Sequence, residues 1–133
     1  MQEFNLKLVD SIDNNVEEFV RGLLIGVAAS GKTIPYSELG WLLGIDVRAG
    51  DYPRKILSTI LGAVGSYEHD QGRPVITAVV VFKESDDEWG REVVGKGFYA
   101  LLENLQKHPD PDPIVAHAVE LGACHTHWKG KLQ

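Results

Sequence analysis

The sequence predicts an α+β domain in which a helix, a short strand, two helices and a β-hairpin follow one another, with extra helices at the C-terminus. Three observations support this prediction. Apolar residues recur every three or four positions over 13–29 and 53–70, as in helices with one buried face. Pro35 disfavours helix between them. The β-branched run over 75–82 is typical of a buried strand. This order is winged-helix-like, the order of a winged helix-turn-helix.

The composition favours one domain over residues 1–133, since 44% of the chain is hydrophobic and 24% is charged. Residues 1–12 are predicted to form an arm, and residues 108–133 a C-terminal helical extension. No apolar run reaches the ~20 residues that span a bilayer. The N-terminus lacks a signal-peptide pattern, and Cys124 is the only cysteine. We therefore expect a cytoplasmic protein that binds no membrane.

The first helix is expected over residues 13–29, with Asn14 and Glu17 in a capping arrangement and Gly31 as the left-handed residue at its end. One stripe of this helix is predicted to face the core. It comprises Val16, Phe19, Val20, Leu23, Leu24 and Val27.

A short helix should follow the extended residues 32–36. Ser37 is expected to cap it and Gly44 to end it. Three leucines are predicted to be buried, with Trp41 packed in the core or at its edge. These leucines are Leu39, Leu42 and Leu43.

The third helix, residues 53–70, has the clearest periodicity, and Pro53 suits its first turn. Its apolar side comprises Ile56, Leu57, Ile60, Leu61, Val64 and Tyr67. Its opposite side is small, polar and mildly basic. That side comprises Lys55, Ser58, Thr59, Gly62, Ser66 and His69.

The remaining chain predicts a hairpin and two helices. A strand over 75–82 leads through the polar loop 84–90 to a return strand over 92–94, which together form a wing. A helix is expected over 98–107, and Asp112 and Pro113 should open the last helix. The inward stripe of that helix is predicted to be Ile114, Ala118, Leu121, His125 and Trp128.

The leading prediction is a non-catalytic nucleic-acid-binding or regulatory module that uses the third helix, and the charge distribution points to that helix. The net charge is −6, yet residues 48–83 form a basic island between two acidic segments. Cations would contact phosphates, while hydroxyls would reach bases or backbone, and Tyr36 would lie at a phosphate-binding helix start. The candidates are Arg48, Arg54, Lys55, Ser58, Thr59, Ser66, His69 and Tyr36. An ordinary solvated helix face explains the pattern equally well.

The acidic wing tip supports a different class of function. Carboxylates are repelled by phosphate, so this tip would instead meet a basic partner protein. The chain would then be an acidic protein–protein interaction module or inhibitor. The partner-binding residues of this alternative are Asp86, Asp87, Glu88 and Trp89.

Two resemblances bear on these alternatives. Gly31, Lys32, Thr33, Tyr36 and Leu39 spell Gly-Lys-Thr-x-x-Tyr-x-x-Leu and, with the helix that follows, resemble the DNA-binding part of the alkyltransferase-like proteins. That family's Pro-Cys-His-Arg motif is missing here, so the resemblance implies the shape without the alkyl-transfer reaction. The order GKTIPYSELG, HDQGRP, VITAVVV and GKGFY is similar to small uncharacterised bacterial and phage proteins, some linked to anti-phage defence.

Two motifs for an enzyme are weak. Residues 26–33 match the Walker pattern G-x-x-x-x-G-K-T, but that motif must follow a strand, and here it follows a helical stretch. His117, Cys124, His125 and His127 are histidine and cysteine metal-ligand types. On a helix, however, His117 and Cys124 lie roughly 10 Å apart, and adjacent residues do not share a face. We expect no catalytic residue, no metal and no cofactor, and an enzyme remains the weakest of three interpretations.

Overall fold

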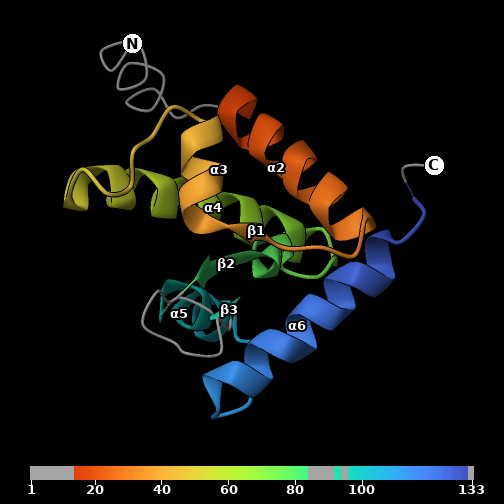
Figure 1. The fold of residues 1–133 in the computed structure, drawn as a ribbon. Coiled ribbons are helices and arrows are strands. Elements are labelled where there is room, and N and C mark those ends of the chain that lie inside the picture. Colours follow the sequence, from red (N-terminus) through yellow and green to blue (C-terminus); the bar gives the residue numbers. More distant parts are fainter. Residues whose placement is uncertain (1–13, 84–91, 94–95, 132–133) are drawn as a thin grey trace.

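The computed structural model describes residues 14–83, 92–93 and 96–131. This part of the chain contains five α-helices, a 3-10 turn and three short strands (Figure 1). The helices are α2 (Asn14–Ala29), α3 (Tyr36–Leu42), α4 (Asp51–Asp70), α5 (Lys96–Asn104) and α6 (Pro113–Trp128). The other elements are β1 (Ile34–Pro35), the 3-10 turn η1 (Ile76–Val79), β2 (Val80–Lys83) and β3 (Glu92–Val93). The fold is therefore mostly helical with a small sheet, which agrees with the α+β prediction.

The sheet has the order β1-β2-β3. β1 runs parallel to β2, with Ile34 beside Val80, whereas β3 runs antiparallel to β2, with Val93 beside Phe82. The antiparallel pairing of β2 with β3 agrees with the predicted hairpin. The predicted loop over 84–90 lies outside the described residues.

The prediction of one strand over residues 75–82 is wrong for its first half. Ile76–Val79 form the 3-10 turn η1, and only the residues after it join the sheet. The backbone before η1 is bound by α6, because the Val75 N–H donates to Glu120 Oε2 at 2.8 Å and the Val75 carbonyl accepts from Cys124 Sγ at 3.3 Å. A run that is buried on every side has no periodicity to distinguish a strand from a turn.

The core is built around η1, which contacts α2, α4 and α6. Val20 and Leu24 of α2 and Leu57 and Ile60 of α4 are completely buried. Each such aliphatic side chain contributes about 1.5–3 kcal/mol relative to its exposed state. The long helices α2 and α4 are therefore held together by the stripes that their periodicity predicts.

Glycines end α2 and α3 as predicted. Gly31 and Gly44 have φ values of 72° and 75°, in the left-handed region. After α3, the Gly44 N–H donates to Trp41 O at 3.0 Å and the Ile45 N–H donates to Gly40 O at 2.7 Å. These are the two bonds of a Schellman motif, which satisfies carbonyls left free at a helix end.

Several side chains lie on other faces than expected. Phe19 and Leu42, predicted to be buried, are 57% and 52% exposed. Tyr67 is 49% exposed, and Trp41 is 76% exposed instead of packed. Ser37 does not cap α3, because the cap position is Pro35 and no side chain caps the helix. The contacts between elements are narrower than the apolar stripes, so residues at the stripe edges remain in water.

The last helix begins as predicted, but its buried side only partly matches the predicted stripe. Asp112 Oδ1 accepts from the Ile114 N–H at 3.0 Å, and Pro113 occupies the first turn. Trp128 is buried and Leu121 packs against the core as predicted, whereas Ile114 and Ala118 are exposed. The other buried residues of the helix are Ala116, Glu120 and Cys124. The helix is apolar on both sides, so periodicity cannot choose the buried one. No helix in the described ranges is both long and apolar enough to cross a membrane.

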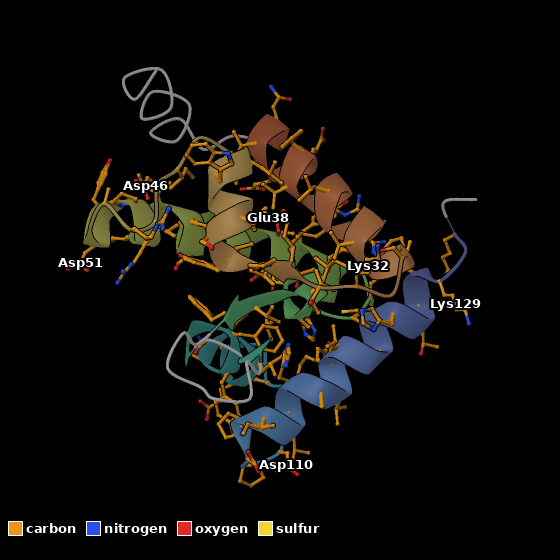
Figure 2. All side chains as sticks on the ribbon, in the orientation of Figure 1. Lys32, Glu38, Asp46, Asp51, Asp110 and Lys129 are labelled. Atoms are coloured by element: carbon orange, nitrogen blue, oxygen red, sulfur yellow. The ribbon has the colours of Figure 1, made fainter. Side chains whose placement is uncertain are left out.

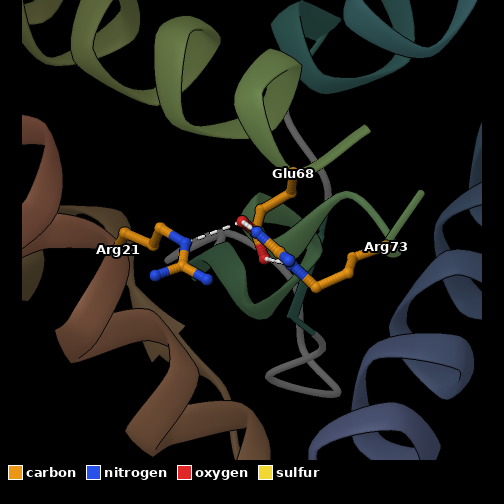
Figure 3. Close-up of polar contacts among 3 residues, drawn as sticks. All are labelled: Arg21, Glu68 and Arg73. Carbon is orange, nitrogen blue, oxygen red and sulfur yellow. Dashed lines mark hydrogen bonds and ion pairs between the residues drawn. The ribbon is translucent and has the colours of Figure 1, made fainter. Parts of the chain in front are cut away.

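An ion-pair triad ties α2 to the end of α4 (Figure 3). Glu68 has no exposed surface, and its carboxylate accepts from Arg21 Nε at 2.7 Å and from Arg73 Nη2 at 2.8 Å. The Arg21 and Arg73 guanidinium groups lie 5.5 and 5.8 Å from the centre of the Tyr67 ring. This arrangement accounts for the exposure of Tyr67, whose ring packs against the two cations.

Candidate nucleic-acid interface

The first turns of α4 expose most of the predicted interface. Arg54, Lys55, Ser58 and Thr59 are all exposed on this helix, and Arg48 is exposed in the turn before it. In helix-turn-helix proteins the N-terminal residues of the recognition helix contact base edges. The geometry of α4 is thus suitable for such contacts in its first half.

The second half of α4 is less available because α5 covers part of it. A Cβ atom at Gly65 would lie 2.7 Å from Leu101 Cδ2, so α5 packs directly against the glycine. Ser66 and His69 are half-buried. The predicted surface is therefore concentrated at the N-terminal end of the helix.

The Tyr36 side chain is a part of the fold, while the place of this residue at a phosphate-binding helix start stays a prediction. The side chain is 7% exposed, and its ring stacks on Phe82 with the centroids 4.6 Å apart. Its hydroxyl donates to Arg54 O at 3.0 Å and lies 3.4 Å from Ser58 Oγ. Tyr36 thereby fixes the start of α3 against the first turns of α4.

The cations at this end of α4 have acidic neighbours. Arg48 pairs with Asp46 at 4.0 Å, and the Arg54 Nε donates to Val47 O at 2.8 Å. Figure 2 shows Asp46 and Asp51 at the N-terminal end of α4, with Glu38 on α3. The local charge is therefore close to balanced, and Lys55 and Arg48 are the cations best placed for a phosphate.

A cleft of about 910 Å³ lies between α3, the turn before α4 and the first turns of α4. Trp41 and Phe82 supply exposed aromatic surface to it, at 76% and 39% exposure. Arg48 and Arg54 line the same cleft. Aromatic rings beside guanidinium groups are able to stack on bases. The sequence does not predict that these two rings line one cleft, because only the parallel pairing of β1 with β2 brings Phe82 beside α3.

A second hollow of about 370 Å³ lies between α4, β2 and α5. Tyr36, Ser58 and Phe82 line both hollows, so the stacked ring pair separates them. Thr77 also lines the second hollow, and its Oγ1 is buried with no hydrogen-bond partner among the described residues. An unpaired buried hydroxyl is destabilising.

We expect Thr77→Val to stabilise the protein by about 1 kcal/mol, because the substitution removes a desolvated hydroxyl and keeps the side-chain volume. The midpoint of urea unfolding measures this effect. Ser58→Val, at an exposed position of the same hollow, serves as the comparison. A lower midpoint for Thr77→Val would mean that the hydroxyl has a partner in the folded protein.

The histidines and the cysteine of α6 are used in packing. His117 Nε2 donates to Ala78 O at 2.7 Å, and His125 Nε2 donates to Lys32 O at 2.9 Å. Burial raises the pKa of the Cys124 thiol to about 12, which keeps it protonated at neutral pH. Within the described residues no group of three His, Cys, Asp or Glu side chains is placed to hold a metal ion.

The Walker-like residues lie at the end of a helix. Gly26 is within α2, and Gly31 and Lys32 form the turn that leaves it. A phosphate-binding loop instead follows a strand and opens a helix. The alternative partner-binding residues Asp86, Asp87, Glu88 and Trp89 lie outside the described residues.

The fold and the site define a mostly helical α+β protein whose surface at the start of α4 carries cations, neighbouring carboxylates and exposed aromatic rings. Comparisons with protein-family models, with curated proteins and with solved structures found no match to this chain.

Proposed function

We propose that the protein is a non-catalytic DNA-binding module of the winged-helix type. In this proposal α3 and α4 form the helix-turn-helix, α4 enters the major groove, and the β2–β3 hairpin is the wing. The order of α2, β1, α3, α4, β2 and β3 supports this assignment. Residues 31–39 resemble the corresponding segment of the alkyltransferase-like proteins, and this resemblance supports the same function.

The observation that carries the proposal is the combination at the start of α4. Lys55 and Arg48 are exposed cations, Ser58 and Thr59 are short enough to let a groove approach, and the cleft beside them contains Trp41. Phosphate contacts by cations position a protein on DNA, and short polar side chains reach base edges. The charges, the hydroxyls and the aromatic surface thus occupy one face.

The charge of the whole chain predicts weak and strongly salt-dependent binding. With a net charge of −6, the protein is repelled by DNA at long range, and only the basic island offsets this repulsion. Each phosphate contact adds about 0.9 to the slope of log affinity against log salt.

The test is fluorescence anisotropy with a mixed-sequence duplex at low and at physiological salt. We expect Arg48→Glu with Lys55→Glu to weaken binding by about tenfold or more and to reduce the salt slope by about 2. Arg54 is left intact because its guanidinium also binds the Val47 carbonyl.

The matched control is Lys129→Glu with Lys131→Glu, which makes the same charge change on two exposed residues. Lys129 lies at the end of α6 (Figure 2). This control should keep most of the affinity. Equal losses in both double variants would show a non-specific charge effect and reject the α4 surface. A folded parent protein that binds no duplex would reject the proposed function.

A further inference from the structure

The second hollow, between α4, β2 and α5, has the lining of a small-molecule site. Its volume of about 370 Å³ lies in the range of ligand pockets, which begins near ~300 Å³. Aromatic rings of Tyr36, Phe82 and Phe98 contribute to its wall, and none of the described residues that line it is charged. An ion that entered the hollow would lose its water without gaining a counter-charge, which is unfavourable. The lining is therefore suited to a neutral and largely apolar molecule.

One polar atom in this wall is buried without a partner. Thr77 of η1 is 4% exposed, and its Oγ1 makes no hydrogen bond within the described part of the chain. The other two hydroxyls of the lining differ, because those of Tyr36 and Ser58 lie 3.4 Å apart and Tyr36 also donates to the Arg54 carbonyl. Ligand pockets combine apolar walls with a few polar groups that fix the orientation of the ligand. The Thr77 hydroxyl is such a group.

Gly62 of α4 keeps the hollow open. It lines the hollow, and a Cβ atom added there would meet no other atom within 4 Å. Three residues later, a Cβ atom at Gly65 would lie 2.7 Å from Leu101 Cδ2 and 3.3 Å from Thr77 Oγ1. Helices α4 and α5 are thus in close contact at Gly65 and separate at Gly62. Glycine is unfavourable inside a helix, so its presence at position 62 preserves space at a cost to the helix.

The volume sets the size of the molecule. An apolar cavity of about 150 Å³ accepts a benzene molecule, and the second hollow is more than twice as large. Two fused rings are therefore a suitable size, and flat aromatic rings pair favourably with the aromatic rings of the wall. A threonine hydroxyl both donates and accepts hydrogen bonds, so an N–H, an O–H or a carbonyl group would satisfy it.

We propose that the second hollow binds a neutral, planar aromatic molecule of about two fused rings, with one hydrogen-bonding group paired to Thr77 Oγ1. The apolar wall supplies the affinity, and the Thr77 hydroxyl fixes the orientation. Binding here needs no nucleic acid, so the site and its tests are independent of the proposed DNA binding.

Indole and indene are the probes for the first test, because they share a two-ring frame and differ only in an N–H against a CH₂ group. Both are titrated into the full chain and followed by amide NMR spectra. Indole should bind with a dissociation constant on the order of 0.5 mM and shift the amide signals of Gly62, Thr77 and Gly97, which line the hollow. A parent protein that binds neither probe would overturn the proposal.

Thr77→Val tests the hydrogen bond. We expect the ratio of indole affinity to indene affinity to fall by about fivefold in this variant, since only indole loses a partner. The variant is expected to be more stable than the parent, so the change would not come from unfolding. An unchanged ratio would mean that the Thr77 hydroxyl pairs with water alone, and this result would overturn the proposal.

Gly62→Leu tests the location. The leucine side chain would fill the hollow from α4 and should abolish the binding of both probes. The matched control is Gly22→Leu, which adds the same side chain on α2, where a Cβ atom also meets nothing within 4 Å. This control should bind indole like the parent, and the midpoint of urea unfolding shows that both variants are folded. Equal affinities of the two variants for indole would place the binding elsewhere and reject the site.

Discussion

Replacing Glu68 by glutamine, a nearly isosteric change, is expected to destabilise the protein by about 3 kcal/mol. Glu68 has no exposed surface and accepts hydrogen bonds from both Arg21 and Arg73. The glutamine leaves two guanidinium groups without their counter-charge, and they are only 30% and 23% exposed. The free energy of urea unfolding at neutral pH measures this loss.

The loss of unfolding free energy caused by Glu68→Gln should depend on pH. Burial by itself raises the pKa of Glu68, but the hydrogen bonds from Arg73 and Arg21 outweigh it and hold the pKa below its ordinary value of 4.5. The ion pairs therefore contribute fully above the pKa of the unfolded chain, and the contribution is lost as the pH falls through the lower pKa of the folded protein. The stability difference between parent and variant should narrow in acid.

Glu103→Gln is the matched control, since Glu103 is an exposed glutamate on α5. It should change the unfolding free energy by no more than about 0.5 kcal/mol. A Glu68→Gln variant as stable as this control would mean that the triad makes no net contribution. A pH-independent difference would mean that the effect comes from packing instead of charge.

The second large effect is expected at Gly40 in α3. A Cβ atom there would lie 2.7 Å from the Ile45 carbonyl oxygen and 3.0 Å from Val47 Cγ1. The nearer atom belongs to the backbone of the turn between α3 and α4 and cannot rotate away. Gly40→Val should therefore separate α3 from this turn and cost about 3 kcal/mol, at the upper end for overpacking.

Gly22→Val separates this clash from the intrinsic helix propensity of valine. Gly22 lies in α2 with no atom within 4 Å of an added Cβ. Its variant should unfold within about 0.5 kcal/mol of the parent in urea. If Gly40→Val behaves like Gly22→Val, the turn is able to move freely, and the rigid placement of α3 against α4 in the candidate interface is wrong.

The candidate interface was predictable where it depends on one helix. The 3.6-residue period places Lys55, Ser58 and Thr59 opposite Leu57 and Ile60, and the structure exposes the first three and buries the other two. The pairing of Tyr36 with Phe82 was not predictable, because those residues meet only when β1 pairs with β2. The packing of α5 against Gly65 was likewise not predictable, because it is a contact between segments that are distant in the sequence.

Three of the helix ends are local features that the chain alone was enough to place, whereas the start of α3 was not predicted correctly. Gly31 and Gly44 supply left-handed backbone, and Asp112 accepts a hydrogen bond from a residue two positions later, so no distant segment is needed. The choice between a strand and a 3-10 turn after Val75, and the choice of the buried side of α6, required tertiary contacts. In both segments apolar residues occur on every side, so only the positions of the packing partners determine which groups are buried.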